Sequence, residues 1–285
     1  MKIAVASGKG GTGKTTIALA LAYYFSNTGK QVDLYDCDVE EPNVDLFLKS
    51  TITESAKAVV NIPAVNIDEC NSCGKCEKIC EFNAIVLFNK KPLVFPDLCH
   101  SCGGCSLVCP TGAISEIEKP IGETIEGSKE NIFYTGGRLM ISEPMSPPLI
   151  KQVKKFVNNS HVSIFDSPPG TSCPAVTTIH DSQYVIVVTE PTPFGLHDMK
   201  LLIEFLVQIQ IPFGVVINRS DIGNNDVVNF CEKSGIDILA EIPHSIDIAK
   251  SYAKGDFIEL FFNEHKERLN AIVQTINSVV KEDAV

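Results

Sequence analysis

The sequence predicts an α/β fold with a doubly wound, mostly parallel sheet that is interrupted by a small α+β insert. Three observations lead to this prediction. An apolar strand at the N-terminus runs directly into a glycine-rich loop and a helix, and from about residue 121 short apolar strands alternate with helical stretches. Between these two parts, eight of the 11 cysteines fall between Cys70 and Cys109. Alternating strands and helices favour a parallel sheet covered by helices on both faces.

The first part of the α/β domain, residues 1–63, begins with an apolar, β-branched strand over Lys2–Ser7. A helical period follows over Thr15–Asn27 and ends at Gly29, because glycine commonly terminates helices. A second buried strand is predicted over Val32–Tyr35.

The insert is predicted over residues 64–119, where two short apolar stretches, Val86–Phe88 and Leu93–Phe95, indicate a β-hairpin. The α/β domain resumes over residues 120–285. Its further strands are predicted at Val162–Phe165, Tyr184–Thr189, Phe213–Ile217 and Ile238–Ala240. The segment Asn263–Lys281 has one apolar helical face. We expect it to pack on the sheet, since a membrane-lying helix would carry a basic polar face and bulky aromatic residues.

The charge of the chain limits its partners. Its 24 basic and 35 acidic side chains give a formal net charge of −11, which argues against a nucleic-acid binder that neutralises phosphates. No apolar run approaches the roughly 20 residues that span a bilayer, so we expect no stable membrane insertion. The N-terminus turns polar too early for a signal peptide, and a cytoplasmic location is therefore expected.

A phosphate-binding loop is predicted directly after the first strand. Gly8, Lys9, Gly10, Gly11, Thr12, Gly13, Lys14 and Thr15 match the pattern G-x-x-x-x-G-K-[ST], and Thr16 follows in the predicted helix. Backbone N–H groups of such a loop bind phosphates with the positive end of the helix. Lys14 is expected to reach the β- and γ-phosphates of ATP, and Thr15 to bind Mg²⁺. The alternative, a glycine-rich turn without a ligand, is disfavoured by the complete motif in this context.

The second lysine of the loop, Lys9, gives it a sequence that resembles the deviant P-loop of the MinD/ParA family, which includes the nitrogenase iron protein and the Mrp-type cluster carriers. Other motifs fit this resemblance. They are Asp36-Cys37-Asp38 followed by Pro42-Asn43, as in switch I; Asp166-Ser167-Pro168-Pro169-Gly170, as in switch II; Asn218-Arg219-Ser220-Asp221 after a late strand; and Ile242-Pro243. The resemblance covers nearly all of the chain outside the insert.

The resemblance implies a role for each matching residue. Lys9 would contact the nucleotide of a partner subunit, in a homodimer or a heterodimer with a paralogue that forms on ATP binding. Asp38 would orient the attacking water, Asp166 would hold Mg²⁺ through a water, and Asn218 would recognise adenine, with Gly170 among the nucleotide-binding residues. Together these imply a slow ATPase that a partner stimulates. For two of the acidic residues a structural interpretation stays open, with Asp36 as a turn or helix cap and Asp38 as a solvated loop charge.

The cysteines of the insert form two complete runs with the spacing C-x₂-C-x₂-C-x₃-C. This spacing is typical of bacterial two-cluster ferredoxins, in which the fourth cysteine of each run binds the other cluster. The predicted ligand sets are Cys70, Cys73, Cys76 and Cys109 for one [4Fe–4S] cluster, and Cys99, Cys102, Cys105 and Cys80 for the second. Zinc is the alternative, because paired C-x₂-C units also form tetrahedral sites.

Three cysteines lie outside the insert. Cys173 follows Asp166 by seven residues, where the nitrogenase iron protein has a cysteine that helps to bridge a cluster across its dimer axis. The second cysteine that such a bridge needs is missing here, so we favour a small buried residue at Cys173. Cys37 and Cys231 are predicted to be structural. His100, beside Cys99, is either a surface residue or a hydrogen-bond donor to a cluster sulfur.

Three functions compete. The leading hypothesis is an ATPase dimer that couples ATP to electron transfer through the two clusters, toward an unidentified redox protein. The second is a factor that carries or inserts a metal or cluster into a client protein. Mrp-type carriers use a C-x₂-C pair near the C-terminus, and the only cysteine after Cys173 is Cys231. The third is positioning on membranes or DNA, which the acidic charge and the lack of a basic amphipathic tail disfavour.

Overall fold

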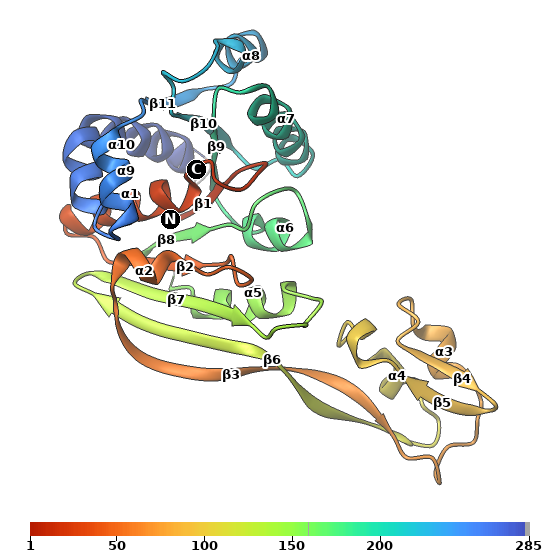
Figure 1. The fold of residues 1–285 in the computed structure, drawn as a ribbon. Coiled ribbons are helices and arrows are strands. Elements are labelled where there is room, and N and C mark those ends of the chain that lie inside the picture. Colours follow the sequence, from red (N-terminus) through yellow and green to blue (C-terminus); the bar gives the residue numbers. More distant parts are fainter. Residues whose placement is uncertain (159, 283–285) are drawn as a thin grey trace.

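A nine-stranded sheet organises the larger part of the molecule, called the body below (Figure 1). The computed structural model describes residues 1–158 and 160–282. In sheet order the strands are β11 (Ile238–Ile242), β10 (Phe213–Asn218), β9 (Tyr184–Thr189), β1 (Lys2–Ala6), β8 (Val162–Asp166), β2 (Val32–Asp36), β7 (Ile132–Leu139), β6 (Ile114–Lys129) and β3 (Thr51–Val65). The strands from β11 to β7 are parallel to their neighbours, whereas β6 and β3 are antiparallel. The predicted mostly parallel sheet is confirmed.

Helices cover both faces of this sheet. One face carries α1 (Lys14–Asn27), α2 (Val44–Leu48), α9 (Ile246–Ala253) and α10 (Ile258–Glu282), and the other carries α5 (Pro147–Val153), α6 (Cys173–Ile179), α7 (Pro193–Gln208) and α8 (Asp226–Ser234). A short 3₁₀ helix, η2 (Lys154–Phe156), follows α5. Strand β1 shows that side chains are buried on both faces of the sheet. Ile3 and Val5 pack under α1 and α10, while Ala4 and Ala6 pack on the opposite side. The central strands are therefore mostly apolar, as expected of parallel strands that are covered on both faces.

Three strands on one side of the sheet were not predicted from the sequence. β7 lies parallel to β2, and β6 and β3 extend the sheet beyond it. β3 and β6 pair from Thr51 opposite Ser128 to Val65 opposite Ile114, and this ribbon continues past the body to carry the insert (Figure 1). The positions 63/64 and 119/120 lie inside these two strands rather than in a linker.

The insert is the segment of residues 66–113 between β3 and β6. It contains α3 (Lys75–Ile79), β4 (Ile85–Phe88), β5 (Lys91–Val94), the 3₁₀ helix η1 (Pro96–Leu98) and α4 (Gly104–Leu107). The predicted hairpin is confirmed, since β4 and β5 pair antiparallel from Ile85–Val94 to Phe88–Lys91. The packed centre of the insert is small and consists of Cys76, Ile85 and Ile114 with partly buried neighbours.

The final helix, α10, packs its apolar side on α1 and the sheet, as predicted. It bends at His265, whose backbone leaves the helical region. Among residues 1–158 and 160–282, none of the helices is both long and apolar enough to cross a lipid bilayer.

Candidate nucleotide cleft and cysteine pockets

The glycine loop connects β1 to α1 and is held against the end of β10. Gly13, at the N-terminal cap of α1, has φ +97°, and a Cβ atom there would collide with the side chain of Asn218. The Asn218 amide donates a hydrogen bond of 2.8 Å to the Thr12 carbonyl. No side chain caps the first turn of α1. Its backbone N–H groups are therefore available to an anion, in the way helix N-termini bind phosphate.

Lys14, Thr15 and Asp166 form the polar centre beside this loop. The Thr15 hydroxyl donates a hydrogen bond of 2.6 Å to Asp166 Oδ2, and Asp166 Oδ1 is buried without a hydrogen-bond partner within the described part of the chain. Burial raises the pKa of the Asp166 carboxyl, against the opposing effects of Thr15 and Lys14. Burial also lowers the pKa of Lys14. An oxygen pair of this kind, one hydroxyl and one carboxylate, suits Mg²⁺.

Asp36 is fully buried and shapes the segment that follows β2. Its carboxylate accepts backbone hydrogen bonds from Asn43 at 2.9 Å, Val44 at 3.0 Å and Asp38 at 3.2 Å. Burial raises the pKa of Asp36 well above its usual value, and the neighbouring Asp166 adds to this effect. The structure thus supports the capping interpretation of Asp36, because this side chain holds the start of α2.

Asp38, two residues further on, is half-buried and faces the cleft. Burial raises its pKa to about 6, although the nearby Lys14 ammonium opposes the change. The alternative of a fully solvated loop charge is therefore wrong for Asp38. Asp36, Asp38, Lys14 and Asp166 come together at the carboxyl ends of β2 and β8, the edge where open α/β sheets bind ligands.

The cleft itself is open and has a volume of about 450 Å³. At one end it is lined by Gly10, Gly11, Lys14, Thr15, Thr16, Asp38 and Asn218, and at the other by Pro243, Tyr252 and Phe261. Of the residues predicted to bind nucleotide, Gly8, Lys9, Thr12, Asp166 and Gly170 do not line this cleft. Its polar glycine-loop end and its partly aromatic far end suit a nucleotide, with phosphates at the first and a base at the second.

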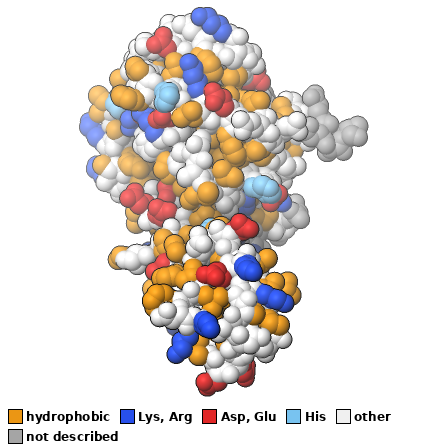
Figure 2. All heavy atoms as spheres, turned by 90° about the vertical axis from the view of Figure 1, so that its right-hand side faces the viewer, with side chains coloured by type: hydrophobic (Ala, Val, Ile, Leu, Met, Phe, Trp, Pro, Cys, Tyr) orange, Lys and Arg blue, Asp and Glu red, His pale blue; other side chains and the backbone are white. Residues whose placement is uncertain are grey.

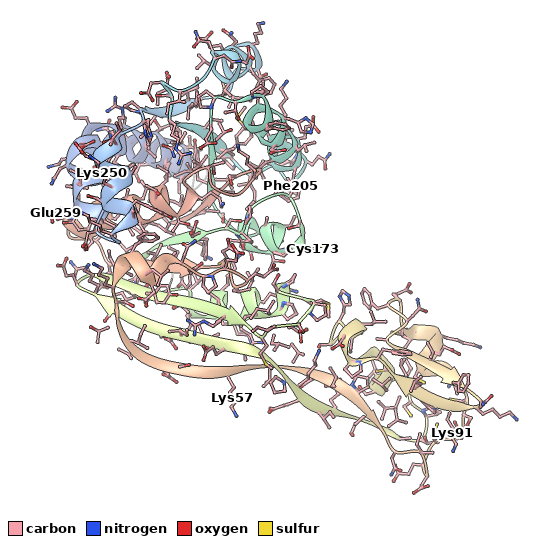
Figure 3. The ribbon with its side chains drawn as sticks, in the orientation of Figure 1. Lys57, Lys91, Cys173, Phe205, Lys250 and Glu259 are labelled. Atoms are coloured by element: carbon pink, nitrogen blue, oxygen red, sulfur yellow. The ribbon has the colours of Figure 1, made fainter. Side chains whose placement is uncertain are left out.

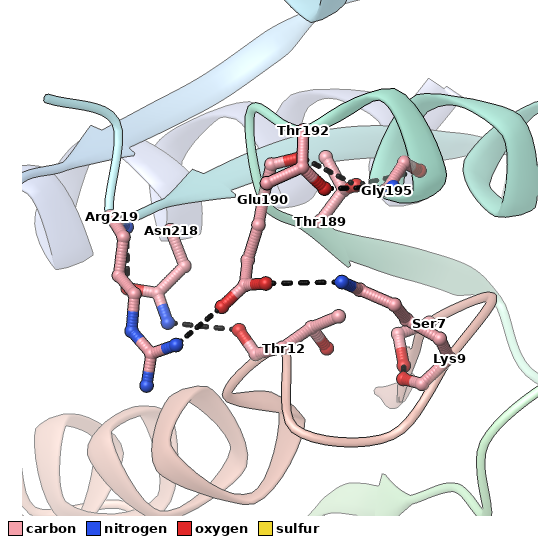
Figure 4. Close-up of polar contacts among 9 residues, drawn as sticks. All are labelled: Ser7, Lys9, Thr12, Thr189, Glu190, Thr192, Gly195, Asn218 and Arg219. Carbon is pink, nitrogen blue, oxygen red and sulfur yellow. Dashed lines mark hydrogen bonds and ion pairs between the residues drawn. The ribbon is translucent and has the colours of Figure 1, made fainter. Parts of the chain in front are cut away.

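Lys9 lies on the other side of the loop, in a cluster of charged residues that the sequence analysis did not find (Figure 4). Its Nζ lies 3.2 Å from Glu190 Oε2, and Arg219 Nη1 donates to Glu190 Oε1 at 2.6 Å. The Glu190 side chain is only 12% exposed. In the sequence, the only feature that points to Glu190 is its charge directly after the buried strand β9. In this conformation Lys9 is therefore bound within its own chain.

The eight cysteines of the insert line two pockets. The first is lined by Cys70, Cys73, Cys76 and Cys109, and the second by Cys80, Cys99, Cys102 and Cys105. These are the same two sets that the sequence spacing predicts, including the exchange of the fourth cysteine. Within residues 1–158 and 160–282, no three His, Cys, Asp or Glu side chains converge closely enough to hold a single metal ion.

The two cysteine loops have the same backbone conformation. Ser72 and Ser101 have φ of 57° and 56°, and Gly74 and Gly103 have φ of 74° and 70°. In each loop the serine N–H donates a hydrogen bond of 3.4 Å to the first cysteine sulfur. Four thiols around one pocket, with N–H groups directed at sulfur, are the donor set that iron–sulfur clusters use. The site fits the predicted clusters.

The remaining predicted residues lie as follows. Cys37 and Cys231 are buried, in agreement with a structural role. Cys173 is exposed at the start of α6 (Figure 3), so the interpretation as a small buried residue is wrong. The cause is that the chain reaches the surface at Pro169 and stays there until α6 begins. His100 is exposed and stacks on Phe82 with ring centroids 3.5 Å apart.

Comparison with known proteins gives a consistent result. The model of the family described as CobQ/CobB/MinD/ParA nucleotide binding domain matches residues 3–258. Two uncharacterised proteins of Methanocaldococcus jannaschii are 34% identical over 89% of this chain and 88% of theirs, and 30% identical over 97% of both chains. An iron–sulfur cluster carrier protein of Aquifex aeolicus is 24% identical over 98% of this chain and 68% of its own.

Solved structures show the same fold. The septum site-determining protein MinD from Pyrococcus horikoshii, complexed with Mg-ADP, superposes with a TM-score of 0.57 at 19% identity, over 98% of this chain and 94% of that protein. The cell division ATPase MinD from Pyrococcus furiosus superposes with a TM-score of 0.58 at 18% identity, over 100% and 99% of the two chains.

Proposed function

Because the chain belongs to the CobQ/CobB/MinD/ParA nucleotide-binding family, we propose that it is an ATPase that couples its nucleotide state to electron transfer through two [4Fe–4S] clusters in the insert. The observation that supports this most is the combination, in one chain, of the glycine-loop cleft with two pockets that are each lined by four cysteines. A cluster in such a pocket supplies one-electron redox chemistry, whose potential depends on hydrogen bonds to sulfur and on solvent exposure.

Each group of the cleft has a role in this proposal. Lys14 binds the β- and γ-phosphates together with the N–H groups of the loop and of α1. Thr15 and Asp166 hold Mg²⁺, the second through a water, and Asn218 is assigned to the recognition of adenine. Asp38 orients the attacking water, and its raised pKa of about 6 keeps the carboxyl close to the working range of a base at neutral pH. Catalysis in phosphoryl transfer depends mainly on such positioning and charge.

Lys9 is the residue that makes dimer formation depend on bound nucleotide in this proposal. Its ammonium is not needed for phosphate binding within the chain, because Lys14 occupies that place. We assign it to the nucleotide of a second subunit, in a homodimer or a heterodimer with a paralogue. To reach that nucleotide, Lys9 must leave Glu190, which Arg219 then continues to neutralise. Dimer formation thus exchanges one ion pair for another.

A second candidate function is the transfer of clusters to a client protein. It is favoured by the relatives named iron–sulfur cluster carrier proteins. The insert offers eight thiols for such cargo, whereas Cys231, the only cysteine after Cys173, is buried. A carrier would deliver iron and sulfide, and an electron-transfer protein would keep both. We place either activity in the cytoplasm, where thiols stay reduced.

The test is a redox titration of anaerobically purified protein, followed by electron paramagnetic resonance, with and without a non-hydrolysable ATP analogue. Coupling of about 1–3 kcal/mol is typical of linked sites, and 1.4 kcal/mol equals about 59 mV for a one-electron couple. We expect a shift of that size, together with an equal change in analogue affinity between reduced and oxidised protein. The variant Lys14→Ala, which weakens phosphate binding, should abolish the shift.

Two other outcomes contradict electron transfer. Equal potentials with and without the analogue, in protein that keeps its iron, would remove the coupling. Loss of iron and sulfide to an added cluster-free ferredoxin during ATP turnover would establish the carrier function instead.

A further inference from the structure

An ion cluster joins the insert to the body. Lys119 lies on β6 where the ribbon leaves the body, and its Nζ lies 2.8 Å from Asp97 Oδ1 and 2.9 Å from Glu143 Oε2. Asp97 belongs to η1 of the insert, and Glu143 belongs to the loop between β7 and α5 of the body. The Glu143 side chain is only 7% exposed and that of Lys119 only 19%. One ammonium thus bridges carboxylates from the two parts of the molecule.

The Glu143 loop, residues 140–146, is bound to the segment that contains Asp38. Leu139, just before the loop, donates a backbone hydrogen bond of 2.8 Å to the Val39 carbonyl. At the other end of the loop, the Ser146 hydroxyl donates to Glu40 Oε1 at 2.8 Å. Val39 and Glu40 directly follow Asp38 in the sequence. A displacement of that segment when a γ-phosphate binds is therefore transmitted to both ends of the loop.

Asp97, the insert residue of the ion cluster, is connected to the second cysteine pocket. Asp97 precedes Cys99 by two residues, and the Cys99 N–H donates a hydrogen bond of 3.2 Å to the Pro96 carbonyl within the same short helix. The sulfur of Cys99 in turn accepts the N–H of Ser101. The contacts therefore run without a break from Asp38 to a cysteine of this pocket, and Figure 1 shows the end of β7 directed toward the insert.

Charge makes this contact stronger than an ordinary surface pair. Partial burial lowers the pKa of Lys119, but hydrogen bonds to Asp97 and Glu143 outweigh it and hold the pKa above its usual value. An exposed ion pair contributes little, whereas removing the partner of a buried carboxylate leaves an unpaired charge that is costly. Glu143 therefore holds Lys119 in place, and Lys119 holds Asp97.

We propose that Lys119 is a positioning residue that transmits the nucleotide state of the cleft to the second cysteine pocket, through the 140–146 loop on one side and Asp97 on the other. This inference rests on the function proposed above and specifies how its two sites communicate. When the Asp38 segment moves, the loop carries Glu143, the bridging ammonium follows, and η1 shifts the Cys99 loop. The hydrogen bonds and solvent exposure at that pocket change, and with them the reduction potential of a cluster bound there.

The experiment compares four anaerobically purified proteins by the same redox titration with and without the ATP analogue. They are the wild type, Lys119→Arg, the double variant Lys119→Met/Glu143→Gln, and Arg138→Met. The double variant removes both charges, so no buried carboxylate is left unpaired. Arg138→Met is the matched control, because Arg138 on β7 pairs with Glu123 on β6 at 3.1 Å in an exposed position of the same sheet edge.

We expect the wild type, Lys119→Arg and Arg138→Met to show the nucleotide-dependent shift, about 59 mV for a tenfold change in analogue affinity. In the double variant the change should fall below about twofold, or about 18 mV, with the analogue affinity of the oxidised protein and the iron content unchanged. A full shift in the double variant, or an equal loss in Arg138→Met, would overturn the role of Lys119 alone. A wild type with intact clusters and no shift would overturn the proposed function itself.

Discussion

The body and the insert are held together by different means. In the body, two large clusters of buried apolar side chains lie on the two faces of the sheet. In the insert, the buried cluster consists only of Cys76 and Ile85 together with Ile114 at the start of β6. Many large apolar side chains of the insert remain exposed, as the orange surface of its tip in Figure 2 shows. They include Ile79, Phe82, Phe88, Leu93, Phe95, Leu98 and Leu107, with exposed fractions from 41% to 88%.

This difference shows what each part needs in order to fold. Segments as small as the insert rarely bury enough apolar surface to offset the loss of chain entropy, and they are commonly stabilised by disulfides or metals. The cysteines of the insert are free thiols arranged around two pockets. We infer that bound clusters supply the stability that apolar burial supplies in the body, as metal binding does in other small metal-dependent domains.

The largest expected effect follows from removing the clusters. In protein stripped of iron and sulfide under reducing conditions, amide protons of residues 66–113 should lose protection by about 1,000-fold, which corresponds to about 4 kcal/mol. Amides of β1 and β8 should keep theirs, because their burial does not involve the insert. Hydrogen exchange followed by mass spectrometry measures both regions in one sample. Equal protection of the insert with and without iron would contradict the inference that clusters stabilise it.

A smaller effect separates two buried isoleucines. Ile164 on β8 is completely buried in the body, and Ile85 on β4 is 1% exposed in the insert. Ile164→Ala should lower the free energy of unfolding of the body by about 2–5 kcal/mol, because it leaves a cavity in a packed core. Ile85→Ala should leave that unfolding transition unchanged. Urea denaturation followed by circular dichroism suits this protein, since it has no tryptophan.

The same pair of variants also tests whether the body and the insert unfold independently. If Ile85→Ala moved the urea midpoint of the body as far as Ile164→Ala does, the two parts would unfold as one cooperative unit. The distinction between a burial-stabilised body and a cluster-stabilised insert would then be wrong.

The smallest effect concerns the free-energy cost of partly burying a charged carboxylate in the body. Burial raises the pKa of Asp38 to about 6, above its value in the unfolded chain. The folded protein then binds more protons than the unfolded one between about pH 4 and pH 7, so its stability falls as the pH rises through this window. Asp38→Asn removes this cost. At pH 7 it should stabilise nucleotide-free protein by on the order of 1 kcal/mol, or about 2–4 °C in Tm.

Calorimetry at several pH values checks this sign. The gain should vanish below about pH 3, where Asp38 is protonated in both states. A stabilisation that stays constant from pH 4 to pH 8 would exclude the charge of Asp38 as its cause.

The features that the sequence predicts are those whose residues lie close together in the chain. The glycine loop is one contiguous motif between a strand and a helix, and each cysteine set is defined by short spacings within the insert. The central strands are also readable, because strands buried on both faces form short apolar runs. For these elements local pattern and tertiary position agree.

The features that the sequence does not predict depend on distant partners. Lys9 meets Glu190, and Lys119 meets Glu143, only after the sheet has formed. β3 gives no strand signal, since its first seven residues are all exposed and lack the alternation of a half-buried strand. β7 is obscured by Gly136-Gly137, which usually marks a turn. A Cβ atom at Gly137 would press on Val39 and on Leu149 of α5, so glycine here permits close packing.

The pairing of β3 with β6 determines how the insert is attached to the body. At the end of the ribbon Val65 lies opposite Ile114, so the chain leaves and re-enters the sheet at adjacent positions. Antiparallel strands in this arrangement are ordinarily joined by a turn of two to five residues. The whole cysteine-bearing segment therefore occupies the place of a hairpin turn. Replacing residues 66–113 by such a turn would therefore leave the pairing of β3 with β6 in place.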